Sequence, residues 1–99
     1  MARFSVYKNP EGKGFLLDVQ ADLLDHLNTR VVVPLLPPSA APAPAHRLNP
    51  VFQVGGQAVV MATQFMAAIP APVLKVPVHS LADSRNEITA ALDLLFQGF

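Results

Sequence analysis

A long uncharged stretch, from Leu48 to Leu74, most limits the folds that this chain can adopt. It is long enough to suggest a membrane-spanning helix. However, the glycine pair Gly55-Gly56 lies near its centre, and other polar or helix-breaking residues interrupt it throughout. A membrane helix would have to accommodate all of these, namely Asn49, Pro50, Gln53, Gln57, Gln64, Pro70 and Pro72. Strands of an almost fully buried sheet explain the stretch better.

The same stretch contains the clearest local signal in the chain. Two runs rich in strand-forming residues, VFQV (51–54) and QAVVMATQ (57–64), flank Gly55-Gly56. A two-residue glycine loop between such runs is typical of a β-hairpin with a type I′ or II′ turn. We therefore predict a hairpin over residues 51–64.

Further strands are predicted on both sides of this hairpin. FSVY (4–7) and FLLDVQ (15–20) flank NPEGKG (9–14), which has the composition of a turn, so residues 4–20 are expected to form a first hairpin. RVVVPLL (30–36) is apolar on both faces and indicates a buried strand, in which Pro34 marks an edge or a bulge.

Three other segments are less regular. Residues 21–28 are expected to form a turn of helix or a bend that carries Leu23 and Leu24 into the core. VLKVPV (73–78) is expected to form a short strand that is interrupted at a proline. PPSAAPAPAHRLNP (37–50) contains five prolines, which exclude a long helix and favour extended, polyproline-like backbone. This Pro/Ala-rich loop is either a recognition segment or a tolerated insertion.

The end of the chain changes to helical periodicity. Ser84 and Glu87 have the spacing of a capping box, and Ser80 with Asp83 offers an alternative start. We predict a C-terminal helix over about 84–97. Its apolar stripe follows the spacing i, i+3, i+4, i+7 and i+11 and consists of Ile88, Ala91, Leu92, Leu95 and Phe99.

The last three residues are unusual for a chain end. Gly98 lies where helices are commonly closed by a left-handed residue, and an aromatic ring at Phe99 follows it. Chain ends are more often polar and poorly ordered. Phe99 either packs back against the helix as a Schellman-type contact or serves a partner.

Composition narrows the functional classes. The 99 residues predict one domain, residues 1–99, with no net charge and only 14% charged residues, whereas about 25% is usual. This apolar surplus favours self-association, and the absence of a basic stripe argues against direct nucleic-acid binding. The absence of cysteine excludes disulfides and thiolate metal sites. No signal peptide or membrane span is recognisable, so we expect a cytoplasmic protein.

No catalytic constellation is apparent. His26, His46 and His79 are far apart, and none has a metal-ligand partner at i+3 or i+4. Asp22 and Asp25 lie near His26, but no nucleophile accompanies them. We therefore expect no metal, no cofactor and no catalytic residue, and a binding role is the default hypothesis.

Several segments, in this order and spacing, resemble the CcdB family of toxins from toxin–antitoxin modules. The most specific are D-V-Q-A-D-L-L-D (18–25), V-V-P-L (32–35) and the ending I-x-x-A-L-D-x-L-F-x-G-F (88–99). The resemblance implies a mainly β fold with a C-terminal α-helix (α+β). The implied fold is a five-stranded antiparallel sheet of SH3-like barrel type with smaller strands, the CcdB/MazF-like toxin fold, assembled as a homodimer.

The resemblance also implies a function. CcdB-like proteins are not enzymes; they bind the A subunit of DNA gyrase and trap it on cleaved DNA. The final three residues of the family, often Trp-Gly-Ile, carry this activity, and here they are Gln97, Gly98 and Phe99. Gly98 and the apolar Phe99 match the pattern, whereas Gln97 replaces an aromatic anchor.

A CcdA-like antitoxin is the second partner that the resemblance implies. In the family, antitoxin contacts involve the first hairpin loop and the loop after the third strand. In this chain the corresponding candidates are Lys8, Asn9, Glu11, Lys13, His46 and Arg47.

Two alternatives remain open. The first is a degenerate relative that dimerises and binds antitoxin without poisoning gyrase, which Gln97 favours. The second is a MazF-like endoribonuclease, whose acid/base candidates are Arg30 with Asp18 or Glu11. The neutral charge and the few basic residues argue against the second alternative.

Overall fold

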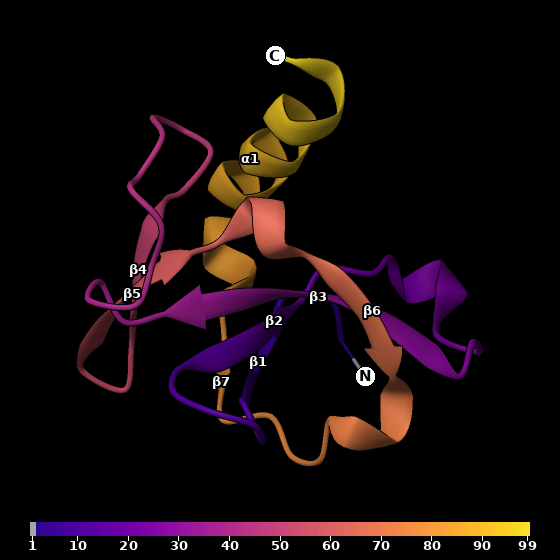
Figure 1. Ribbon diagram of the computed structural model, residues 1–99. Helices are drawn as coiled ribbons and strands as arrows, with labels where there is room; N and C mark the ends of the chain where they lie inside the picture. Colours follow the sequence, from indigo (N-terminus) through magenta and orange to yellow (C-terminus); the bar gives the residue numbers. More distant parts are fainter. Residues whose placement is uncertain (1) are drawn as a thin grey trace.

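A computed structural model describes residues 2–99 and shows a strongly curled antiparallel sheet that forms a nearly closed barrel with one C-terminal helix (Figure 1). The strand order is β4-β5-β3-β2-β1-β7. The remaining strand, β6, is not part of this order and pairs only with β3. The predicted mainly β fold with a C-terminal helix is therefore confirmed, and residues 2–99 contain seven strands, some of them short. The elements are β1 Ser5–Lys8, β2 Phe15–Asp18, β3 Thr29–Leu36, β4 Val51–Val54, β5 Gln57–Met61, β6 Ala67–Pro70, β7 His79–Ser80 and α1 Arg85–Gln97.

Both predicted hairpins are present. In the second, Val54 pairs with Gln57 across Gly55 and Gly56, whose φ angles are 58° and 79°. Positive φ at both central residues defines a type I′ turn, which glycine adopts without the steric cost of a Cβ atom. In the first hairpin β1 pairs with β2, and Lys8 lies opposite Phe15.

The strand β3 is the centre of the sheet, and Pro34 lies in its interior rather than at an edge. One side of β3 pairs with β2 over residues 32–35, while the other pairs first with β6 and then with β5. The Pro34 carbonyl accepts a hydrogen bond from the Ala62 N–H at 2.9 Å, so Pro34 faces the interval between β6 and β5. The missing N–H therefore falls where β3 changes partners, and the interior position is tolerated.

Apolar side chains fill both faces of β3. Because side chains alternate across a strand, Val33 and Leu35 face the main core whereas Val32 joins a smaller cluster with Tyr7, Leu16 and Leu74. The helix α1 packs on the main core through Ile88 and Ala91, both fully buried. The fully buried or nearly buried residues of the main cluster are Phe4, Val6, Leu17, Val19, Val33, Leu35, Phe52, Val54, Val59, Met61, Leu81, Ile88 and Ala91.

Two further sequence-based expectations are wrong. Leu23 and Leu24 lie on a short 3-10 turn, Asp22–Leu24, and are 87% and 41% exposed rather than in the core. Residues 73–78 do not form a strand: a 3-10 turn covers Ala71–Val73, and the strand before it, β6, was not predicted separately. Pro72 and Pro77 lack the N–H groups that a ladder through this segment would need.

The start of α1 also differs in detail from the capping-box prediction. Ser84 occupies the N-cap position, but its side chain makes no capping hydrogen bond. A 3-10 turn, Ala82–Ser84, leads directly into the helix, and the Ser84 N–H donates to the Leu81 carbonyl at 2.9 Å. This turn holds Ser84 near φ −103° and ψ 20°, away from the extended conformation that a capping residue requires.

Candidate partner-binding surfaces

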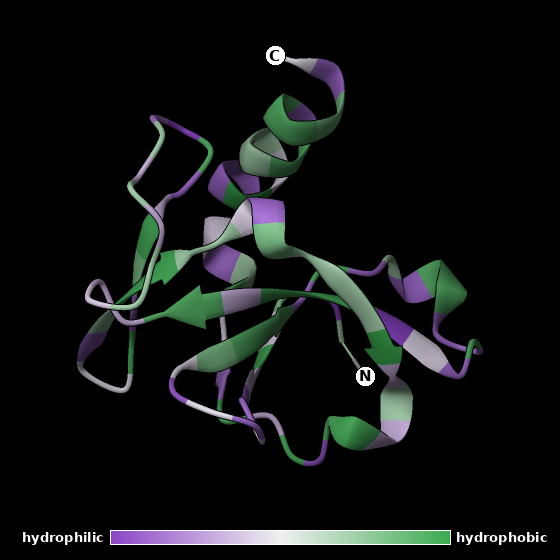
Figure 2. Cartoon of the chain, in the orientation of Figure 1, coloured by the Kyte–Doolittle hydropathy of each residue, from purple (hydrophilic) through white to green (hydrophobic). Residues whose placement is uncertain are grey.

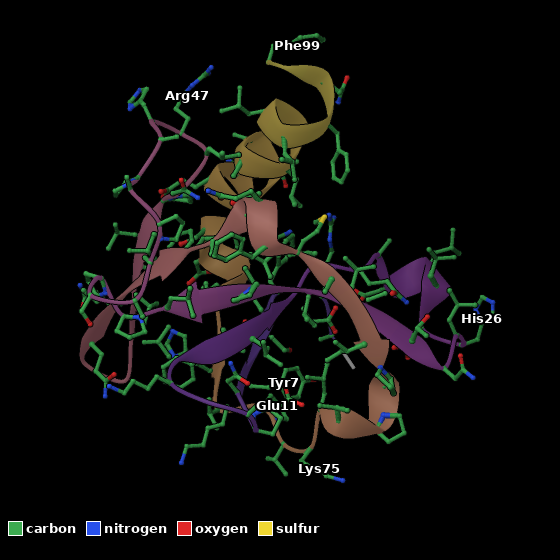
Figure 3. The ribbon with its side chains drawn as sticks, in the orientation of Figure 1. Tyr7, Glu11, His26, Arg47, Lys75 and Phe99 are labelled. Atoms are coloured by element: carbon green, nitrogen blue, oxygen red, sulfur yellow. The ribbon has the colours of Figure 1, made fainter. Side chains whose placement is uncertain are left out.

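The end of α1 presents two aromatic rings to solvent. Phe96 is 70% exposed and Phe99 is 78% exposed. Figure 3 shows Phe99 at the tip of the helix, away from the barrel. Phe99 therefore does not pack back against the helix, and the purely structural explanation of the apolar chain end is wrong.

Local backbone geometry fixes this presentation. Gly98 closes the helix in the left-handed conformation, with φ 81°, and its N–H donates to the Leu94 carbonyl at 3.0 Å. The Gln97 side chain donates to Asp93 Oδ1 at 3.3 Å and so lies along the helix surface. In Figure 1 the last turns of α1 extend beyond the sheet, whereas the first turns cover it. The helix is therefore anchored at one end and presents Gln97, Gly98 and Phe99 at the other.

The tip of the first hairpin supplies a second accessible surface. Lys8, Glu11 and Lys13 are exposed, but Asn9 is half-buried. The Asn9 side chain accepts a hydrogen bond from the Glu11 N–H at 3.0 Å, and the Asn9 N–H donates to the Gly14 carbonyl. Asn9 therefore shapes the turn, and the charged side chains around it are free to meet a partner.

The Pro/Ala-rich loop carries His46 and Arg47, and both are exposed. Residues 37–50 form turns without a regular strand or helix. Arg47 has a φ of 64°, a left-handed conformation that is uncommon for a residue with a Cβ atom. A cleft of about 750 Å³ separates this part of the loop from the outer face of α1, where Asn86, Glu87 and Ala90 line it.

A buried amide fixes the base of this loop. Asn49 Oδ1 accepts from the Ala45 N–H at 3.0 Å, and Asn49 Nδ2 donates to the Met61 carbonyl at 3.0 Å and to Gln64 Oε1 at 2.7 Å. Asn49 is only 5% exposed, so these bonds are shielded from water. The loop is thus anchored to the end of β5 and to the turn that follows it, although its sequence suggests a structureless insertion.

The motif D-V-Q-A-D-L-L-D builds a buried polar network rather than a reactive site. Arg30 donates to Asp18 Oδ2 from Nε at 3.0 Å and from Nη2 at 2.6 Å, and both side chains are almost fully buried. Arg30 Nη1 also donates to the half-exposed Asp25 at 2.9 Å. Gln20 accepts from the Val31 N–H and donates to the Leu24 carbonyl. The motif therefore attaches residues 18–25 to the start of β3.

Burial perturbs two titratable groups in this region. Loss of solvent raises the pKa of the Asp18 carboxyl above its ordinary value, and the bonds from Arg30 and from the Gln20 N–H oppose that shift. Burial also raises the pKa of the Tyr7 phenol, and the negative charge of Asp18 adds to the effect. Neither group is exposed enough to act on a macromolecular substrate, because Tyr7 is 3% and Asp18 0% exposed.

The candidate residues do not form one site. Figure 3 places Glu11 of the first hairpin at the end of the molecule opposite Phe99, whereas Arg47 lies on the Phe99 side. The cleft beside Asn86 and Glu87 confirms that the Pro/Ala-rich loop and α1 are neighbours. His26 lies on a third, separate loop.

Several exposed apolar residues were not recognised from the sequence. Leu23, Leu24 and Leu27 are solvent-exposed near the 3-10 turn, and Val76 and Val78 are 72% and 50% exposed in the segment after β6. Figure 2 shows hydrophobic residues in both places as well as near the helix end. The available signal was three leucines in a polar, turn-like segment, which is also compatible with burial.

Residues 2–99 contain neither a metal-ion site nor a membrane-spanning helix. No group of three or more histidine, aspartate or glutamate side chains there is placed to hold a metal ion. No helix in this part of the chain is long and apolar enough to cross a membrane.

Comparison with known proteins identifies the family. The Mycobacterium tuberculosis toxin MazF-mt6 has a similar structure, with a TM-score of 0.73, 14% identity and coverage of 96% of both chains. An endoribonuclease from a mycobacterial species, solved in complex with its cognate antitoxin, has a TM-score of 0.72 and 17% identity and covers 94% of this chain and 91% of its own. At these identities the two structures show a shared toxin fold. Residues 3–98 match the family described as CcdB protein, so the chain belongs to the CcdB family of toxins from toxin–antitoxin systems.

Proposed function

We propose that this protein poisons DNA gyrase by docking the end of α1 on the A subunit and trapping the enzyme on cleaved DNA. The observation that carries the proposal is the exposure of Phe96 and Phe99 on a helix whose opposite end is anchored in the core. Exposed aromatic rings on a rigid element are characteristic anchors of protein interfaces. A protein with this target acts in the cytoplasm, where gyrase and DNA are located.

Because Gln97 replaces the family's tryptophan, the aromatic contact with gyrase must come from the neighbouring residues Phe96 and Phe99. Gln97 is held along the helix by Asp93, so its amide adds no apolar surface at the tip. Phe99 stands two residues further on and is the more exposed of the two rings. In the proposed interface Phe99 therefore supplies the ring that inserts into the partner, and Phe96 supports it.

We propose that the active form is a homodimer. The large exposed apolar side chains are more numerous than a small monomer needs, and they include Phe65 beside the uncharged edge strand β6. Sedimentation equilibrium is expected to give a mass near twice the 10.6 kDa of one chain. A mass of one chain at micromolar concentration would contradict the dimer.

The second proposed partner is a cognate antitoxin that contacts the first hairpin and the Pro/Ala-rich loop. These surfaces lie toward different ends of a molecule whose longest extent is 33 Å. An extended chain covers about 3.3 Å per residue, so about ten residues are needed to reach from one surface to the other. A flexible extended segment of the antitoxin fits this requirement better than a compact domain.

The structure supports a binding role over RNA cleavage. Arg30 and Asp18, the acid/base candidates, are 1% and 0% exposed and satisfy each other. Neither can reach an RNA strand without unfolding of the network. Glu11 is exposed on the hairpin loop, whereas Arg30 is buried and pairs with Asp18 and Asp25, and a lone carboxylate does not provide an acid/base pair.

The decisive experiment mixes the purified protein with host gyrase and supercoiled DNA and scores linear DNA after detergent and protease treatment. The full-length chain is expected to produce linear DNA, and a chain without Gly98-Phe99 is expected to produce none. Absence of linear DNA from the full-length chain, together with harmless overexpression without antitoxin, would identify the protein as a degenerate toxin. Cleavage of RNA by the pure protein would instead favour the endoribonuclease alternative.

A further inference from the structure

A small cleft lies between β1 and the irregular segment 73–78. Its volume is about 340 Å³, and Tyr7, Lys8 and Pro10 form one wall. Val73, Lys75, Val76 and Val78 form the other. Figure 3 shows Tyr7, Glu11 and Lys75 at the same end of the molecule, away from Phe99. The cleft is thus separate from the proposed gyrase-binding surface.

The cleft is held open by contacts on both sides of its irregular wall. Leu74 is buried in the smaller core cluster, where it packs with Tyr7, Leu16 and Val32. At the other end, the Val78 N–H donates to the Val6 carbonyl at 2.8 Å. Residues 75–77 therefore bridge two fixed points, and the exposed Val76 cannot move into the core without breaking one of them.

The chemistry of the lining specifies an occupant. The charged residues that line the cleft are both lysines, Lys8 and Lys75, and neither forms an ion pair within residues 2–99. Apolar surface dominates the remainder, because three valines and a proline join the Tyr7 ring. A volume of 340 Å³ is near the lower limit of ligand pockets and suits one or two apolar side chains. Carboxylates beside these side chains would meet the lysines at the rim.

We propose that this cleft receives an acidic, extended segment of the antitoxin, with an apolar side chain against Val76 and Val78 and carboxylates at Lys8 and Lys75. The proposal rests on the antitoxin partnership proposed above. Lys8 belongs to the first hairpin, so the cleft continues that exposed surface and extends it to residues 73–78. Lys75, Val76 and Val78 are thereby assigned to partner binding.

The test measures the affinity of the full-length cognate antitoxin for variants of this protein by isothermal titration. Lys75→Glu and Val76→Ser are each expected to weaken binding at least tenfold. The matched controls Arg85→Glu and Val51→Ser change an exposed cation and an exposed valine outside the cleft, and they are expected to stay within twofold of wild type. Equal thermal midpoints would show that all four variants are folded. Wild-type affinity should also fall more steeply with added salt than that of Lys75→Glu.

Carbodiimide cross-linking of the complex tests the acidic character of the segment directly. We expect mass spectrometry to detect isopeptide bonds that join Lys75 or Lys8 to an aspartate or glutamate of the antitoxin. If Lys75→Glu and Val76→Ser both bind the antitoxin as tightly as the wild-type protein does, the assignment of the cleft is wrong and the antitoxin partnership still stands. If the wild-type protein itself fails to bind the antitoxin, both proposals are wrong.

Discussion

Replacement of Arg30 by methionine is expected to lower the free energy of unfolding by about 3–5 kcal/mol at pH 7. Methionine fills much of the volume of the arginine stem but removes both hydrogen bonds to Asp18. Of the donors to the buried carboxylate within residues 2–99, the Gln20 N–H alone would then remain. Chemical denaturation monitored by circular dichroism measures the loss.

The pH dependence of this loss has a definite sign. Without Arg30, the folded-state pKa of Asp18 rises further above its unfolded value of about 3.9, because burial is no longer opposed by the guanidinium. A carboxyl with a raised folded pKa favours folding at pH values below its unfolded pKa, and that contribution disappears as the pH rises through the folded pKa. The difference between wild type and Arg30→Met should therefore be smaller near pH 4 than at pH 7.

Two companion variants separate the buried pair from its exposed neighbour. Asp25→Ala removes a half-exposed partner of Arg30 and is expected to cost no more than about 1 kcal/mol. Asp18→Leu combined with Arg30→Met removes both buried charges and should cost less than the two single changes added together. An Arg30→Met protein as stable as wild type at pH 7 would show that the pair contributes nothing to stability.

The sequence predicts local features of this fold best where one or two residues decide the backbone. Gly55-Gly56 dictates a type I′ turn through its own conformational freedom, and the apolar stripe of α1 identifies the buried face at Ile88 and Ala91. The prediction of a strand over residues 73–78 was wrong. The valines of this segment suggest a strand, but two prolines in and beside it lack the N–H groups that would hydrogen-bond to a neighbouring strand. At Pro34, by contrast, local sequence does not decide the structure. A proline is tolerated in this central strand because its missing N–H faces the interval between β6 and β5.

The polar network illustrates why the site was less predictable than the fold. Arg30 begins a run that looks uniformly apolar, and its partner Asp18 lies twelve residues earlier. Their contact follows from the register of β2 on β3, in which Asp18 lies opposite Val32. Similarly, spacing alone places Leu23 and Leu24 equally well in the core or on the surface. Exposure of an apolar side chain is a property of the whole fold, so only the structure separates a core residue from a partner-binding one.

Replacement of Phe99 by alanine is expected to reduce gyrase-dependent DNA cleavage by a factor of about 30 or more, which corresponds to the loss of an interface hot spot of about 2 kcal/mol. Because Phe99 is 78% exposed and outside the core, the free energy of unfolding should not change measurably. The measurement is the protein concentration that gives half-maximal linear DNA with host gyrase.

Two variants make the Phe99 result specific. Leu23→Ala removes another large apolar side chain, which is 87% exposed on the 3-10 turn Asp22–Leu24, and it should leave the cleavage activity within about twofold of wild type. Gln97→Trp restores the aromatic anchor of the family beside Phe99 and is expected to increase potency. Full activity of Phe99→Ala would mean that the exposed ring is not the anchor. If Phe99→Ala loses activity as expected, its recovery on adding Gln97→Trp would show that one aromatic ring at the helix end is sufficient, whichever of the two positions carries it.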